Sequence, residues 1–145
     1  MLRAEVGGLS IAYQRAGDGP PLVLLHGFSH DSRAWRPQLE SLADQFTVIA
    51  WDAPGAGRSV DPPETFGISD WADCLAGFLA AVAVQQAHIV GLSWGGLLAQ
   101  EFYQRHSEQV QSMADEEAYY WFSKMTDERM GRRSQKAMRI LLAKE

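Results

Sequence analysis

The sequence is poor in cysteine, in long apolar runs and in low-complexity segments. Cys74 is its only cysteine, so the chain can form neither an internal disulfide nor a cysteine-based metal cluster. We therefore expect no metal site, and no cofactor. The longest apolar stretch, PLVLLHGF, falls far short of the roughly 20 residues that cross a bilayer, and the N-terminus MLRAEVGGLS lacks the apolar core of a signal peptide. These absences predict a cytoplasmic protein.

The composition that remains is that of a globular domain, but its charge is unevenly distributed. The 145 residues are 46% hydrophobic and 21% charged, with a net charge of −5. Residues 1–114 carry 12 acidic and 6 basic side chains, whereas residues 129–145 carry 6 basic side chains and a single acidic one. This change predicts two parts, a domain over residues 1–112 and a helical tail of unrelated character over residues 113–145.

The first 110 residues alternate between strand and helix patterns. Gly7-Gly8 suits a tight hairpin turn between two short strands, and LVLLH, FTVIAWD and AHIVGLS are typical of buried strands. Ser69 is the expected N-cap of one helix, and GGLLAQEFYQRHSEQV is expected to form another. Helical spacing relates two apolar sets: Trp35, Leu39, Leu42 and Phe46, then Trp71, Leu75, Phe78, Leu79 and Val82. This order predicts an α/β fold, a mostly parallel sheet with helices on both faces.

The stretch GLSWGG, residues 91–96, surrounds a serine with glycines where a strand should become a helix. Near-absent side chains on both sides of Ser93 predict a turn sharp enough to expose its hydroxyl group. The loops HGFSHD, DAPGAGRS and GLSWGG all follow strands, and parallel sheets bind ligands at the carboxyl ends of their strands. The hypothesis is that Ser93 attacks an acyl carbon and that the backbone N–H groups of Phe28 and Trp94 hold the resulting oxyanion.

Taken in order, the motifs LLHGF, DAPGAGRS and GLSWGG resemble the N-terminal half of an α/β-hydrolase of the esterase, lipase and peptidase superfamily. The resemblance implies a nucleophile elbow at Ser93, an oxyanion hole, and cleavage of ester, thioester, amide or carbon–carbon bonds. Members of this family take the acid and histidine of the triad from the second half of the fold. The residues that follow RHSEQVQSM contain no histidine, so we expect a truncated or fused chain with an incomplete triad.

Several residues next to Ser93 are expected to support the site structurally: His26, Gly27, Asp52, Gly91 and Gly95. Asp52 has Arg58 and Ser59 as candidate hydrogen-bond partners. His30 is the histidine expected at the mouth of the site and is a candidate base. His88 is expected on the surface and His106 at the end of a helix, where a cationic ring complements the helix dipole.

Two functions stay open at this point. The first is a serine hydrolase that acts on a small neutral or apolar acyl substrate, since the aromatic Phe28 and Trp94 border the site without a cluster of lysine or arginine. The second is a catalytically inactive hydrolase-like binding or interaction module that uses a basic amphipathic C-terminal helix. We expect the AHIV strand at or near an edge of the sheet, because its usual neighbour is absent, and an exposed edge could form a homodimer. Neither nucleic acid nor a membrane is an expected partner.

Overall fold

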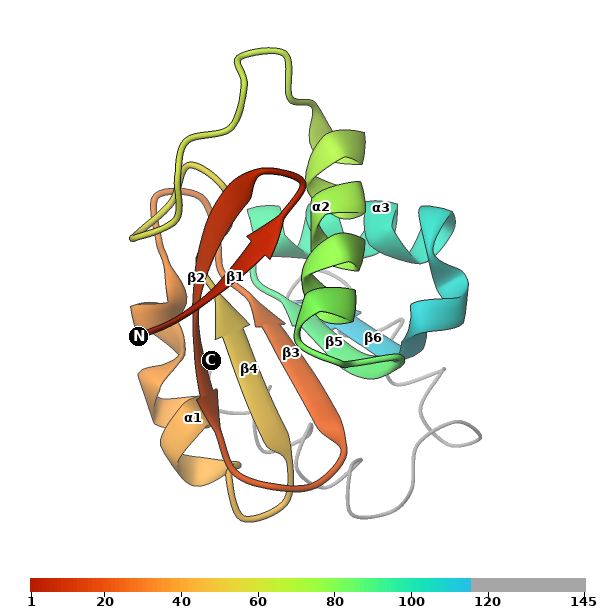
Figure 1. Cartoon of the computed structure of the whole chain (residues 1–145). Coiled ribbons are helices and arrows are strands. Elements are labelled where there is room, and N and C mark those ends of the chain that lie inside the picture. The colour runs from red at the N-terminus through yellow and green to blue at the C-terminus, as the bar shows by residue number, and fades with distance from the viewer. Residues whose placement is uncertain (116–145) are drawn as a thin grey trace.

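The computed structural model describes residues 1–115, which form a six-stranded sheet in the order β1-β2-β4-β3-β5-β6 (Figure 1). Pairing is antiparallel from β1 to β2 and from β2 to β4, and parallel between the other neighbours. The strands are β1 (Leu2–Val6), β2 (Leu9–Ala16), β3 (Pro21–Leu25), β4 (Thr47–Trp51), β5 (Ala87–Gly91) and β6 (Val110–Asp115). The predicted α/β class is confirmed. The basic amphipathic helix expected in the tail lies outside the described residues.

The hairpin between β1 and β2 turns at Gly7 and Gly8, as the sequence predicts. Their φ angles are 55° and 82°. A two-residue hairpin loop whose twist matches its strands needs positive φ at both positions, which glycine adopts without steric penalty. The antiparallel start of the sheet is thus a local consequence of this dipeptide.

Strand side chains alternate between two apolar cores, one on each face of the sheet. Val23 and Ile49 belong to the core covered by α2 (Ile68–Ala81) and α3 (Trp94–Arg105). Leu22 and Val48, one position earlier on the same strands, belong to the core that holds Trp35, Leu39, Leu42 and Phe46. That second core is covered by the short helices η1 (Ser32–Trp35) and α1 (Arg36–Ser41). The predicted helices on both faces are therefore confirmed. Successive side chains of a strand point to opposite faces of the sheet, so each face of these apolar strands needs helices to cover it.

Two helix boundaries differ from the prediction. Helix α2 begins after Gly67 and not after Ser69, because the Asp70 carboxylate accepts a hydrogen bond from the Gly67 N–H at 2.8 Å. The Ser69 hydroxyl donates instead to Glu101 on α3 at 2.9 Å. Helix α3 ends at Arg105, and the residues predicted to prolong it form η2 (Ser107–Gln109) and β6.

The AHIV strand, expected at or near the sheet edge without its usual neighbour, has that neighbour and lies one strand in from the edge. This segment is β5, and β6 pairs with it in parallel from Val110 onward, with one register shift between Ala87 and His88. Val110 and Met113 are buried in the core beneath α3, and this burial stabilises a strand that begins at Val110, where the local pattern favoured helix. Within residues 1–115, β6 is the last strand in sequence and lies at the edge of the sheet opposite β1. It spans position 112, where the composition predicted a domain boundary.

His88 is buried, although the sequence predicted a surface residue. It is 1% exposed, its Nδ1 lies 2.7 Å from the Ser112 hydroxyl, and its ring meets Phe46 edge-on at 6.0 Å. Burial lowers the pKa of His88 below 6.5, because an apolar surrounding disfavours the charged ring. The partner strand β6 and the turn before β4 supply this environment, and neither is visible from the local sequence.

No helix within residues 1–115 is both long enough and apolar enough to cross a membrane.

Candidate functional site

Ser93 occupies a sharp turn between β5 and α3. Its φ of 55° and ψ of −114° lie in a region that residues other than glycine rarely adopt. The residue is exposed. A Cβ atom on Gly91 would overlap the backbone carbonyl group of Gly95, and one on Gly95 would overlap that of Leu25. Glycine at both positions thus lets the chain reverse here while α3 packs closely on β3.

The loop that follows β3 lies directly against this turn. A Cβ atom on Gly27 would stand 3.2 Å from the Leu92 carbonyl oxygen and 3.5 Å from the Ser93 Cβ. The next residues along each segment, Phe28 and Trp94, have backbone N–H groups with no acceptor among residues 1–115. The Trp94 N–H is free because the first residues of a helix have no intrahelical acceptor. The site therefore has two unoccupied backbone donors next to one serine.

His26 links the loops after β3 and β4. Its Nε2 accepts a hydrogen bond from the Ala53 N–H at 3.0 Å, so the ring proton is on Nδ1, which donates to the Gly27 carbonyl at 2.9 Å. The side chain is 3% exposed. Burial lowers the pKa of His26 below 6.5, with a smaller opposing effect from the Gly27 carbonyl. Both ring nitrogens of His26 are engaged in hydrogen bonds to the backbone of the two loops, so the ring has no free nitrogen to accept a proton from Ser93.

Asp52 fixes the loop after β4 from within. Its buried carboxylate accepts hydrogen bonds from the backbone N–H of Ser32 at 2.7 Å and of Arg58 at 2.9 Å. Its own carbonyl accepts from the Ser59 hydroxyl at 2.5 Å. Gly57, with a φ of 50°, packs against the carboxylate so closely that a side chain would collide with it. The two partners predicted from the sequence are present, Arg58 through its backbone.

A cavity of about 480 Å³ lies next to the turn at Ser93, because Trp94 and Gly27, the neighbours of Ser93 in sequence and in space, line it; Ser93 itself is not one of the lining residues. The loops after β3 and β4 form most of its lining, and Trp71 and Trp94 complete it, with ring centroids 5.6 Å apart in an edge-on arrangement. The Trp71 indole N–H donates to the Pro54 carbonyl at 3.1 Å, which fixes the ring in the wall. Phe28 also lines the cavity and is 79% exposed. No lysine or arginine occurs among the described lining residues, and Asp31 is the acidic residue among them, so the wall is largely apolar and carries no described cationic side chain.

The four histidines have different surroundings. His30 is exposed, lines the cavity, and its Nδ1 lies 3.4 Å from the point where a Gly27 Cβ would be. Since the Ser93 Cβ lies 3.5 Å from the same point, His30 and Ser93 both border Gly27. His106 contacts Asp73 at 2.8 Å at the end of α3. Of the four rings, that of His30 is the one placed at the rim of the site with no described hydrogen bond.

Sequence reasoning did not identify Trp71 as part of the site. Its helical spacing assigned it to the apolar face of α2, and it does pack against that core while also forming the cavity wall. No local signal separates these roles, because the ring is held in the wall by a hydrogen bond to Pro54, which lies 17 residues away in the sequence. Within the described part of the chain, no group of three or more His, Cys, Asp or Glu residues could hold a metal ion.

Comparison with known proteins gives consistent matches. The family model described as "alpha/beta hydrolase fold" matches residues 20–136. The chain is 36% identical over 112 residues to the dihydrolipoyllysine-residue acetyltransferase component of the acetoin cleaving system of Cupriavidus necator, covering 77% of this chain and 30% of that protein. It is 35% identical over 105 residues to the pimeloyl-[acyl-carrier protein] methyl ester esterase of Aeromonas hydrophila, covering 72% of this chain and 40% of that protein.

Among solved structures, a bacterial membrane phospholipase A superposes with a TM-score of 0.76 and 36% identity. The match covers 79% of this chain and 38% of the phospholipase chain. The chain thus spans less than half the length of each of these three proteins.

Proposed function

The chain belongs to the α/β-hydrolase family, and from this premise we propose that it is the nucleophile-bearing part of a serine hydrolase that cleaves ester, amide or related acyl bonds. The observation that carries the proposal is the backbone of Ser93, held at a φ of 55° between two glycines that admit no side chain. Such strain persists only where the surrounding structure enforces it, and it clusters at functional sites. A turn of this kind presents a hydroxyl group to solvent at the carboxyl edge of the sheet.

The proposed chemistry is acyl transfer to Ser93 followed by hydrolysis. The Ser93 oxygen attacks the acyl carbon, its proton passes to a base, and the carbonyl π electrons move onto oxygen. The free N–H groups of Phe28 and Trp94 stabilise that oxyanion. Collapse of the intermediate expels the alcohol or amine, which takes up the proton, and water then releases the acid from the serine ester.

The base within this chain is proposed to be His30. His26 is occupied at both nitrogens, His88 is buried beside Ser112, and His106 is held by Asp73. We propose that the triad of this chain is otherwise incomplete. Binding and an oxyanion hole alone leave about 10³ to 10⁴-fold acceleration over water in a dismantled serine protease, so turnover of ordinary esters should be close to background.

The proposed substrate carries a small neutral or apolar acyl group. The wall formed by Phe28, Trp71 and Trp94 offers apolar contact, and no described lysine or arginine lines the cavity to pair with a charged acyl group. We also propose a cytoplasmic location, supported by the single cysteine. Cys74 is buried, and burial raises the pKa of its thiol to about 11, so it is poorly suited to redox chemistry.

Labelling with an activated fluorophosphonate, followed by intact-mass measurement and peptide mapping, tests the proposal. We expect slow single-site modification of Ser93 that Ser93→Ala abolishes. Ser29→Ala is the matched control, because Ser29 is an exposed cavity serine that also has a positive φ, of 64°. Modification elsewhere, or none after prolonged exposure, would favour an inactive binding module. Fast ester turnover that survives Ser93→Ala would contradict the assignment.

The role of His30 has its own readout. His30→Gln should lower the labelling rate, because the variant lacks the imidazole that accepts the serine proton. An unchanged labelling rate in the variant would show that His30 is not the base, whatever the fate of Ser93.

A further inference from the structure

A second hollow, of about 310 Å³, has a wall built from residues that follow β3, residues that follow β4, and Met1 and Gln14 near the N-terminus. We name it the arginine pocket, after the three arginines that line it. Asp31 and Gly57 belong to its wall and also to the wall of the cavity beside Ser93, so the two hollows are neighbours. The arginines are Arg33, Arg36 and Arg58.

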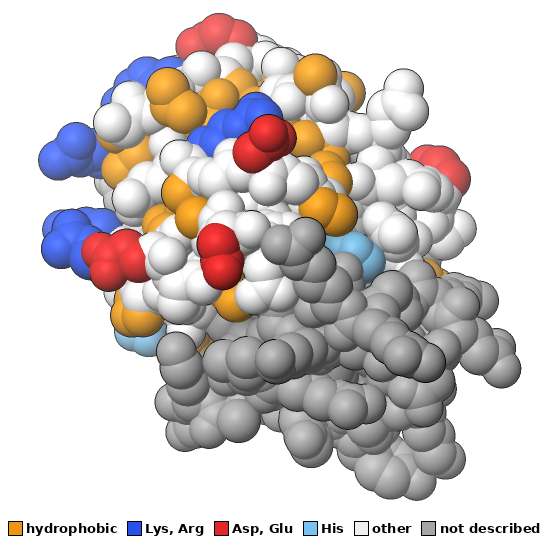
Figure 2. Space-filling model, turned by 90° about the horizontal axis from the view of Figure 1, so that it is seen from below, with side chains coloured by type: hydrophobic (Ala, Val, Ile, Leu, Met, Phe, Trp, Pro, Cys, Tyr) orange, Lys and Arg blue, Asp and Glu red, His pale blue; other side chains and the backbone are white. Residues whose placement is uncertain are grey.

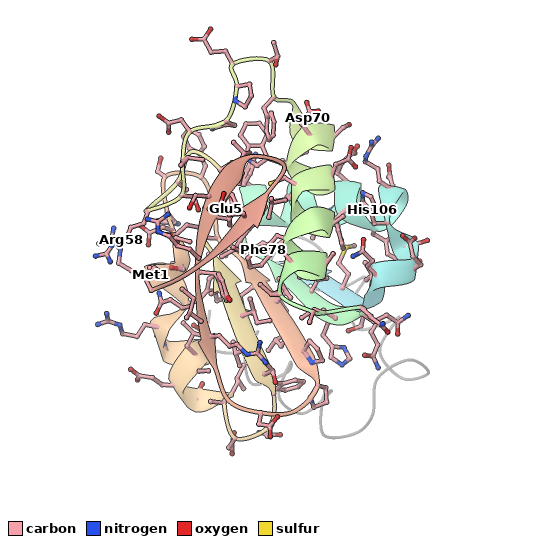
Figure 3. All side chains as sticks on the ribbon, in the orientation of Figure 1. Met1, Glu5, Arg58, Asp70, Phe78 and His106 are labelled. Atoms are coloured by element: carbon pink, nitrogen blue, oxygen red, sulfur yellow. The ribbon has the colours of Figure 1, made fainter. Side chains whose placement is uncertain are left out.

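The arginine pocket gathers much of the positive charge of an acidic protein. Residues 1–114 hold 6 basic and 12 acidic side chains, yet three of those six line this one hollow. A fourth, Arg3, reaches the same corner, where its guanidinium donates to the Arg58 carbonyl at 2.9 Å and to the Ser10 hydroxyl at 3.1 Å. In Figure 3, Met1 and Arg58 lie together at one edge, far from His106, and in Figure 2 the blue side chains gather toward one side.

The acidic groups that face the pocket are already engaged. Asp31 forms a bidentate pair with Arg33, with distances of 2.7 and 3.0 Å, and the hydrogen bonds from Arg33 lower the pKa of Asp31 to about 2. The carboxylate of Asp52 is buried and accepts two backbone N–H groups. Arg36 and Arg58 are exposed, and no carboxylate within residues 1–115 pairs with either guanidinium. The pocket therefore holds three positive and two negative side chains, a net charge of +1, and the guanidinium groups of Arg36 and Arg58 have no carboxylate partner within residues 1–115.

We propose that the arginine pocket binds an oxyanion, a phosphate or carboxylate group, through Arg36 and Arg58. A guanidinium presents paired N–H donors that match both groups in two-point contact. The net negative charge elsewhere repels anions, so a confined positive hollow concentrates them at this position. The anion has two possible sources: a free small anion, or the charged end of a molecule whose neutral acyl part enters the adjoining cavity. Binding itself does not rest on the proposed hydrolysis.

Titration of the full chain with inorganic phosphate at low ionic strength, followed by NMR, tests the pocket. We expect saturable shifts of the Arg36 and Arg58 side-chain signals. Arg58→Gln and Arg36→Gln should each weaken binding about tenfold, which corresponds to the loss of one charged hydrogen bond. Arg15→Gln is the matched control: Arg15 is an exposed arginine of β2 outside the pocket, and its loss should change the affinity less than about twofold. Circular dichroism verifies that all three variants fold.

Equal weakening in all three variants, or shifts that never saturate, would mean that phosphate responds to overall charge only and would overturn the proposal. The source of the anion follows from a second arm, labelling of Ser93 by a phosphonate that carries a phosphate on a flexible leaving group. Competition by inorganic phosphate, lost in Arg58→Gln, assigns the pocket to the charged end of such a molecule. Saturable phosphate binding without competition assigns it to a free anion. Failure of labelling counts against the proposed function and leaves the phosphate titration intact.

Discussion

Replacement of Ser93 by glycine should stabilise the protein while it removes the proposed nucleophile. The φ of 55° and ψ of −114° at Ser93 carry a strain of about 1–3 kcal/mol that glycine escapes. Against this, glycine gives the unfolded chain extra freedom and costs about 0.5–1 kcal/mol relative to alanine. The difference predicts that Ser93→Gly is more stable than Ser93→Ala by up to about 2.5 kcal/mol. For a chain of this size, each kcal/mol raises the Tm by about 4 °C.

Urea unfolding at equal m-values measures the comparison, and alanine is the reference because it lacks the hydroxyl but keeps the Cβ. Ser41, an exposed serine at the end of α1 whose φ is negative, supplies the control pair. There, glycine should be less stable than alanine, so the two sites should differ in sign. A Ser93→Gly variant no more stable than Ser93→Ala would refute the claim that this backbone is strained.

Three further outcomes follow from contacts in the fold. Gly95→Ala should destabilise by more than about 2 kcal/mol, because its Cβ meets backbone that cannot move freely, whereas Gly67→Ala should be tolerated; thermal unfolding compares them. Asp52→Asn should cost about 1–3 kcal/mol, since an amide nitrogen would face a backbone donor such as the Arg58 N–H, as urea unfolding would reveal. The pKa of His88 is lowered in the folded protein, so below pH 6.5 the unfolded chain binds more protons than the folded one. The free energy of unfolding should therefore fall as the pH falls from 7 to 5, and it should fall less in His88→Gln.

The elements with a local cause were predictable from the sequence. Gly7-Gly8 specifies its hairpin through backbone freedom alone, and the strand patterns placed the three loops at one edge because parallel strands end on the same side. The turn at Ser93 was predictable for the same reason, since the spacing of its glycines is a steric requirement of a strand that becomes a helix at once.

The features that depend on distant residues were not predictable. Val110, which the sequence predicted as the end of a helix, begins a strand because β5 offers a partner and α3 covers it, so its local helix pattern was misleading. His88 is buried by Phe46 and Ser112, which lie far from it in sequence. The arginine pocket combines side chains of separate segments, each of which looks like an ordinary surface charge when it is considered alone.

The ring of His26 and the carboxylate of Asp52 have a joint consequence for local unfolding. His26, after β3, accepts the Ala53 N–H that follows β4, while Asp52, on the β4 side, accepts the Ser32 N–H that follows β3. Each loop thus accepts a backbone N–H of the other loop. If one loop opened to solvent alone, a buried polar group in the other loop would lose its hydrogen-bond partner. Amide hydrogen exchange at Ala53 and Ser32 is then governed by one shared opening event, and the two loops behave as a single cooperative unit.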